Sequence, residues 1–134
     1  AALGLSQCRR LAAFKTARQQ IVERYRACCA DLPWLHMAPP PPDQAPFWHL
    51  CQVHCDWQVL GMDRAAVFRS AQAAGIALQV HYIPLHHQPL LADATRMDDL
   101  AGAEAFYAGV LALPCHPGLG ADQDLVLSWL QSLA

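Results

Sequence analysis

The sequence predicts a small α/β domain of the α+β arrangement, in which a long N-terminal helix and shorter helices pack on a sheet of two or three strands. Its 134 residues suffice for one hydrophobic core but not for two. Apolar residues make up 54% and charged residues 15%, which excludes an intrinsically disordered chain. Helical and strand-like segments follow in the order helix, short strand, strand, helix, strand, helix, helix.

The first element is predicted as one long helix over residues 5–30, because this stretch contains no proline and Pro33 follows its end. Arg18 alone interrupts its apolar stripe. The stripe has helical spacing and consists of Leu11, Phe14, Ile21, Tyr25, Cys28 and Leu32. The helix is therefore expected to pack on one side only.

Two strands are expected next. Residues 34–37 predict a short strand, and the four prolines at 39–42 predict a stiff surface connector, because proline cannot continue a sheet or a helix. Residues 47–57 predict a longer strand. Side chains alternate between the two faces of a strand, so four residues share one face here: His49, Cys51, Val53 and Cys55.

The second half of the chain predicts three helices and one strand. A helix over residues 64–74 has a carboxylate cap at Asp63 and is followed by Gly75. Residues 76–83 predict a clear strand that ends at Pro84. Asp98 and Asp99 favour the start of a helix that runs to about residue 111, and residues 122–133 predict the last helix.

Charge and cysteine content exclude several classes of function. Nine Lys and Arg against eleven Asp and Glu leave no broad basic face for nucleic acid or for an anionic membrane. The sequence has no uninterrupted apolar span of about 20 residues, so it predicts no transmembrane helix. The six scattered cysteines are expected to be reduced, as in a cytoplasmic protein. The first five residues include no Met and no helix cap, which favours a chain that starts within a longer protein.

Metal and nucleophile sites find weak support in the sequence. His49, Cys51, His54 and Cys55 form the densest group of ligand types, but alternation on a strand turns His54 away from the others. A buried core strand is the favoured interpretation. Cys115 and His116 are neighbours in sequence, and neighbouring side chains point apart. The sequence therefore predicts no catalytic, cofactor-binding or metal-ligating residue in this chain.

Residues 79–89 are the most unusual segment. Gln79 and His81 share one face where the predicted strand ends, and Pro84 then turns the chain to present His86 and His87 in a loop. Polar side chains at such a place are typical of ligand recognition. Histidines on a strand are equally often structural, so the residues alone leave both interpretations open.

Three motifs resemble the C-terminal part of the DegT-type nucleotide-sugar aminotransferases, which are fold-type I pyridoxal-phosphate enzymes. AALGLSQ at residues 1–7, followed by Arg18, Ile21 and Tyr25, is similar to the interdomain helix of that family. The strand and loop of the family are similar to a second motif, GI at 75–76 with VHYIPLH at 80–86. The approach to the last helix of the family is similar to a third motif, LP at 113–114 with PGL at 117–119. The second motif is closest to the branch that aminates 4-keto-6-deoxy UDP-sugars.

The resemblance implies an activity for a longer protein. Residues 1–32 would form an interdomain or dimer-type helix and residues 33–134 the C-terminal small α/β domain, with the catalytic large domain absent from this chain. An amino acid, usually glutamate, would give its amino group to pyridoxal phosphate, and the loaded cofactor would aminate a nucleotide-linked keto-sugar. The family forms homodimers. The single lysine, Lys15, does not match the Schiff-base position, so this chain alone is expected to be inactive and not to hold the cofactor.

The resemblance also implies a substrate-binding role for His81, Tyr82 and His86, with Gln79 as a neighbour. These side chains are expected to cluster at one exposed edge and to orient substrate rather than to break bonds. A dehydratase or a regulatory homologue without the lysine is one rival. A stand-alone module that binds a metal or a small ligand through the His-rich loop is another.

Overall fold

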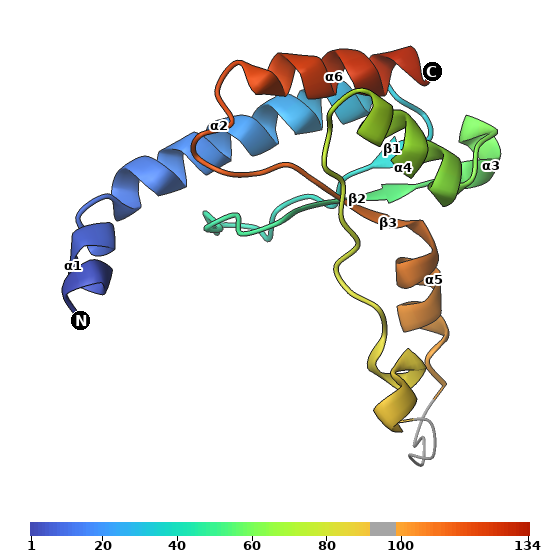
Figure 1. Cartoon of the computed structure of the whole chain (residues 1–134), viewed down its shortest axis with the longest axis horizontal. Coiled ribbons are helices and arrows are strands. Elements are labelled where there is room, and N and C mark those ends of the chain that lie inside the picture. The colour runs from blue at the N-terminus through green and yellow to red at the C-terminus, as the bar shows by residue number, and fades with distance from the viewer. Residues whose placement is uncertain (92–98) are drawn as a thin grey trace.

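The computed structural model describes residues 1–91 and 99–134 and confirms the predicted fold class. Helices surround a small antiparallel sheet (Figure 1). The elements, in chain order, are α1 (Ala2–Cys8), α2 (Leu11–Ala30), β1 (Leu35–His36), β2 (Cys51–Cys55), α3 (Trp57–Leu60), α4 (Arg64–Ala73), the 3₁₀ turns η1 (Leu85–His87) and η2 (Pro89–Leu91), α5 (Ala101–Gly109), β3 (Val110–Leu113) and α6 (Asp122–Ser132). None of the described helices is both long enough and apolar enough to cross a bilayer.

The sheet has three strands in the order β1-β2-β3, and both pairings are antiparallel. Leu35 of β1 lies opposite Cys55, and Cys51 lies opposite Leu113 of β3. Burial alternates along β2, as its sequence predicts, whereas all four residues of β3 are buried. β2 therefore has one face toward the core, and β3 is covered on both faces.

The core lies between this sheet and the helices α2, α4 and α6, and the ribbons of α2 and α6 run side by side (Figure 1). Tyr25, Trp34 and Leu111 are among its most completely buried side chains. The polar Gln123 is also buried, and its Nε2 donates a hydrogen bond of 2.8 Å to the carbonyl of Ile21. That bond offsets the cost of burying the amide and joins α6 to α2.

The predicted N-terminal helix is interrupted. Helix α1 ends at Cys8 and α2 begins at Leu11, with a turn at Arg9 and Arg10. Helix α1 has no buried residue, so no packing against the core holds it in line with α2. The C-terminal half of α2, in contrast, contributes Ile21, Tyr25 and other residues to the core.

Two strand predictions are corrected by the structure. Residues 76–83 form no regular strand; Gln79 alone pairs with Ala112, through backbone hydrogen bonds of 3.3 and 2.8 Å. The predicted strand at 47–57 is shortened to β2, because the carboxylate of Asp56 accepts from the backbone N–H groups of Gln58 and Val59 and starts helix α3.

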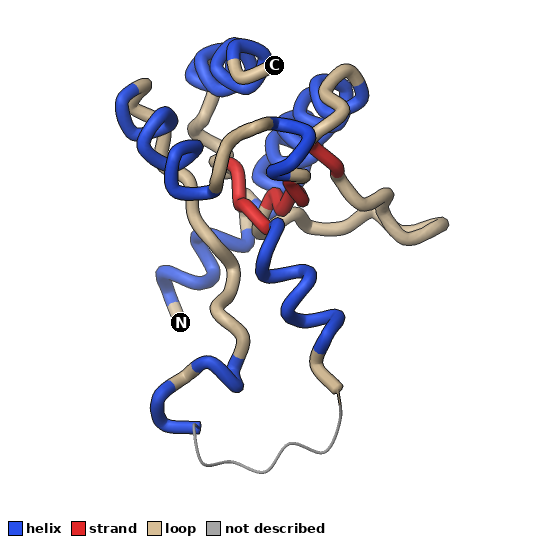
Figure 2. The backbone as a smooth tube through the Cα atoms, turned by 90° about the vertical axis from the view of Figure 1, so that its right-hand side faces the viewer, coloured by secondary structure: helices blue, strands red, loops and turns tan. Residues whose placement is uncertain are grey.

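The third strand replaces the end of a predicted helix. Helix α5 ends at Gly109, and the apolar residues 110–113 continue as β3 beside β2. At the other end of α5, the carboxylate of Asp99 accepts from the N–H of Ala101. The predicted role of Asp98 at this helix start lies outside the described residues. Figure 2 shows α5 and the chain that leads to η1 leaving the sheet in the same direction.

Candidate functional site

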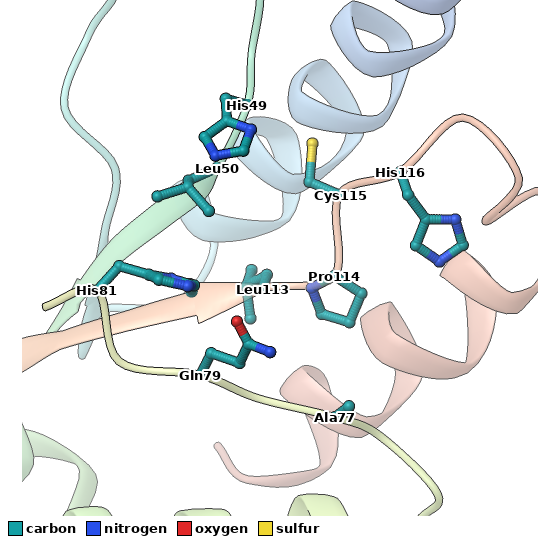
Figure 3. A pocket seen from close by; sticks show the side chains of 10 residues that line it. His49, Leu50, Ala77, Gln79, His81, Leu113, Pro114, Cys115 and His116 are labelled. Carbon is teal, nitrogen blue, oxygen red and sulfur yellow. The ribbon is translucent and has the colours of Figure 1, made fainter. Parts of the chain in front are cut away.

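A cavity of about 290 Å³ lies where β3 ends, between the segment that follows α4 and the chain that enters β2 (Figure 3). Its lining combines an amide, three imidazoles and a thiol with apolar side chains. The lining residues are His49, Leu50, Ala77, Gln79, His81, Ala112, Leu113, Pro114, Cys115 and His116. A concave site with a few convergent polar groups is typical of small-molecule recognition.

Gln79 and His81 reach this cavity because the chain before them is extended. Gln79 pairs with Ala112 of β3, and the Nε2 of Gln52 on β2 donates a hydrogen bond of 2.8 Å to the carbonyl of His81. Leu78 between Ala77 and Gln79 is buried on the opposite side. Figure 3 shows the Gln79 amide and the His81 ring facing the same space beside Leu113. Two of the predicted site residues therefore line one cavity.

The His81 imidazole has a nitrogen with no partner. Among the described residues, no group hydrogen-bonds its Nδ1, although this atom is buried. The ring also makes an edge contact with Tyr82, with the centroids 4.7 Å apart. A buried polar atom without a hydrogen bond costs about 1–3 kcal/mol and is unusual in a folded protein. Such an atom beside a cavity is typical of a binding site.

Arg18 joins the two walls of the cavity. Its Nη1 donates to the carbonyl oxygens of Trp48 at 2.9 Å, His49 at 3.1 Å and Cys115 at 2.7 Å. These carbonyls belong to the chain that enters β2 and to the chain that leaves β3. The one charged residue in the apolar stripe of the first predicted helix is thus an internal hydrogen-bond donor, which a sequence pattern does not reveal.

The cysteines are suited to the core rather than to nucleophilic chemistry. Burial raises the pKa of Cys115, and the nearby Arg18 lowers it only in part. Burial also raises the pKa of Cys29 to about 11 and that of Cys55 to about 12. These thiols remain protonated at neutral pH, and a protonated thiol is a poor nucleophile. The core interpretation of Cys51 and Cys55 agrees with their burial on β2.

The predicted clustering of His81, Tyr82 and His86 at one edge is wrong for His86. The extended chain carries His86 beyond the sheet into η1, where its Nε2 lies 2.5 Å from a carboxylate oxygen of Glu104 on α5. The Nε2 of His87 lies 2.8 Å from the same oxygen. Tyr82, which lies between His81 and His86 in the sequence, is 67% exposed. The proline turn that we expected to gather these side chains separates them instead.

Two histidines of the cavity, His49 and His116, were not predicted as site residues. His49 was placed on the core face of a long strand, but the strand begins only at Cys51, and His49 precedes it in an irregular segment. His116 follows β3 after Pro114. His116 lies three residues beyond the end of β3, a strand that the sequence did not predict.

Comparison with known proteins finds several sugar aminotransferases. Helicobacter pylori PseC, an aminotransferase involved in the biosynthesis of pseudoaminic acid, matches with a TM-score of 0.87 at 24% identity, covering 98% of this chain and 36% of that chain. S. venezuelae DesV, solved in complex with a ketimine intermediate, matches with a TM-score of 0.81 at 28% identity, covering 97% and 35%. The spore coat polysaccharide biosynthesis protein SpsC of Bacillus subtilis (strain 168) is 29% identical over 125 residues, covering 91% of this chain and 32% of SpsC.

The two solved structures share the fold of this chain over nearly its whole length. Residues 1–131 match the DegT/DnrJ/EryC1/StrS aminotransferase family, and the chain belongs to it. The resemblance carried by the three motifs is therefore confirmed. The chain spans about a third of the length of the relatives that it matches.

Proposed function

We propose that this chain is the C-terminal small domain of a pyridoxal-phosphate-dependent aminotransferase. The enzyme would move an amino group from an amino acid, glutamate in our proposal, to a nucleotide-linked keto-deoxy-sugar. The observation that carries the proposal is the family match over residues 1–131. In this proposal residues 1–32 lead from a large domain into the small domain of residues 33–134. The greater length of the relatives leaves room for such a large domain.

In this proposal the cavity beside β3 orients the sugar substrate. Its amide and imidazole groups can donate and accept hydrogen bonds, which suits hydroxyl groups on a sugar ring. The unpartnered Nδ1 of His81 supports this role, as does the position of Gln79 on the same wall. Tyr82 and His86 lie farther along the same segment and would contact more distant parts of the substrate.

The residues of this chain do not fit a complete cofactor site. When bound, pyridoxal phosphate supplies the electron sink for amino transfer. Lys15 is the only lysine, and it does not line the cavity beside β3. Among the described residues, no carboxylate lines that cavity either. We therefore assign the Schiff-base lysine and the partner of the pyridine nitrogen to the part of the enzyme outside this chain.

The proposal extends to compartment and assembly. All six cysteines are free and four of them are buried, which supports a reducing, cytoplasmic setting. A homodimer would be the working unit, with amino-acid and nucleotide-sugar substrates as its small-molecule partners. We propose neither nucleic acid nor a membrane surface as a partner, and the net charge of −2 supports this.

We expect Gln79→Ala and His81→Ala each to raise the KM for the nucleotide-sugar about tenfold in the enzyme that contains this chain. One lost hydrogen bond to a bound substrate corresponds to about 1.4 kcal/mol, or a factor of ten. The rate of the half-reaction with glutamate should stay unchanged, because these residues are assigned to the sugar. Steady-state and single-turnover kinetics measure the two effects separately.

The exposed residues Gln58 and His36 provide matched control substitutions to Ala, since neither lines the cavity beside β3. If KM for the nucleotide-sugar is the same in Gln79→Ala, His81→Ala and the controls, this cavity is not the sugar site. Absence of any transamination by the whole enzyme would instead contradict the proposed activity itself.

Pyridoxal phosphate mixed with the 134-residue chain is expected to be removed completely by dialysis. A covalent bond to the cofactor needs a lysine in a desolvating pocket, and Lys15 lies on α2, outside the cavity beside β3. The absorbance of lysine-bound cofactor, measured after dialysis, checks this. A band that persists in the native chain and is lost in Lys15→Ala would contradict the prediction.

A further inference from the structure

Two histidines and one carboxylate converge away from the cavity beside β3. We call them the His86–His87–Glu104 cluster. His86 and His87 occupy the 3₁₀ turn η1, and Glu104 lies in the first turn of α5. The Nε2 atoms of both histidines face the same oxygen, Oε1, of Glu104, at 2.5 and 2.8 Å. Figure 2 shows the two segments projecting together from the sheet.

The ligand atoms of the cluster lie close enough together to reach one metal ion. The two Nε2 atoms and the carboxylate oxygen all lie within 4.8 Å of one another. A tetrahedral Zn²⁺ with bonds of about 2.0–2.1 Å places its ligand atoms roughly 3.3 Å apart. The cluster therefore needs a shift of only about 1 Å per atom, within the reach of side-chain rotation, to surround an ion.

The protein holds these side chains in place before any ion arrives. The His86 side chain is only 11% exposed, and its ring packs on that of His87 with the centroids 4.5 Å apart. The His87 ring in turn contacts Tyr107, at 5.7 Å between centroids. Arg64 lies over the Tyr107 ring and donates to the Tyr107 carbonyl. Such support lowers the entropy lost when ligands are fixed around a metal.

We propose that the His86–His87–Glu104 cluster binds one divalent transition-metal ion of the Zn²⁺ type. Two imidazoles and one carboxylate favour such an ion over Mg²⁺ or Ca²⁺, which prefer sites made of oxygen ligands. Three protein ligands leave a fourth position for water or for an oxygen of a ligand. The proposal rests on this geometry and is independent of the aminotransferase activity.

The carboxyl group of Glu104 is held in its charged form by its two histidine neighbours. Hydrogen bonds from His86 and His87 lower the pKa of its carboxyl group, which is therefore ionised at neutral pH. Without an ion, the same contacts would act as a hydrogen-bonded clip between η1 and α5, and metal binding distinguishes the two roles.

The test titrates Zn²⁺ into the untagged chain in competition with a chromophoric chelator, and then Co²⁺ with detection of its visible absorption bands. Cys8 is exposed and could bind metal on its own, so all proteins carry Cys8→Ser. We expect one Zn²⁺ per chain, and a Co²⁺ spectrum typical of four-coordinate nitrogen and oxygen ligation. His86→Ala and Glu104→Gln should each lower the affinity at least tenfold, since even loss of a group behind a ligand costs about 10–100-fold.

His36→Ala and Glu23→Gln are the matched controls, because both residues lie outside the cluster. Both should keep the full affinity. Glu104→Gln preserves the shape of the side chain, and its circular dichroism shows whether the fold is retained. The proposal is overturned if the chain takes up no Zn²⁺ at micromolar concentration, or if Glu104→Gln and His86→Ala bind it as tightly as the controls do.

Discussion

Replacing Arg18 by Met is expected to lower the free energy of unfolding by about 2–4 kcal/mol. The guanidinium donates to three backbone carbonyls that Met cannot satisfy, and hydrogen bonds that involve a charged group contribute about 1.5–3 kcal/mol each. Water reaches some of these carbonyls and offsets part of the loss, so the effects do not simply add. Urea unfolding followed by circular dichroism measures the change.

The same substitution should disturb the cavity beside β3. Arg18 ties His49 on one wall to Cys115 on the other. We expect the imidazole NMR signals of His49 and His116 to shift in Arg18→Met. Arg9→Met is the control, because Arg9 is exposed in the turn between α1 and α2. Equal stability and equal spectra in the two variants would show that Arg18 does not hold the walls.

Sequence reasoning succeeded where local signals define an element. The carboxylate of Asp63 accepts from the N–H of Ala66 at the start of α4, and Gly75 follows the helix with a φ of 75°, a value that favours glycine. The alternation along β2 likewise places Cys51, Val53 and Cys55 in the core. Each of these features depends on residues that are close in sequence.

Sequence reasoning failed where distant contacts decide the structure. The apolar residues 110–113 fit a buried helix or a buried strand equally well, and pairing with β2 makes them a strand. Residues 76–83 alternate like a strand, yet Gln79 alone finds a bridge partner there. The periodicity of residues 5–30 gave no sign that α1 lacks a packing surface.

The candidate site also combines residues that local sequence predicts with residues that only distant contacts bring together. Gln79 and His81 were predicted because both lie in one short unusual segment. His49 and His116 join them in the cavity through Arg18, whose hydrogen bonds span 30, 31 and 97 residues of sequence. Glu104 meets His86 across 18 residues, outside the segment that drew attention. A single sequence does not show which distant residues come into contact. The His86–His87–Glu104 cluster is therefore visible only in the folded structure.

The 134-residue chain is expected to self-associate through its N-terminal segment. Helix α1 buries no residue of its own, and three leucines project into solvent: Leu3 is 76% exposed, Leu5 61% and Leu11 53%. Phe14 on the same segment is half-buried beneath the guanidinium of Arg10. Apolar side chains arranged along one protruding segment tend to pack against a second copy or to exchange between copies.

Sedimentation or light scattering from micromolar concentration upward measures this association. Burial of the leucines from two chains, less the entropy lost on association, gives a dissociation constant on the order of 100 µM. Leu3→Glu combined with Leu5→Glu should abolish the dimer, because two charges would then enter an apolar contact. Leu125→Glu is the control, since Leu125 is 51% exposed on α6. A chain that stays monomeric at millimolar concentration, or a dimer that survives the double substitution, would show that α1 is not the contact.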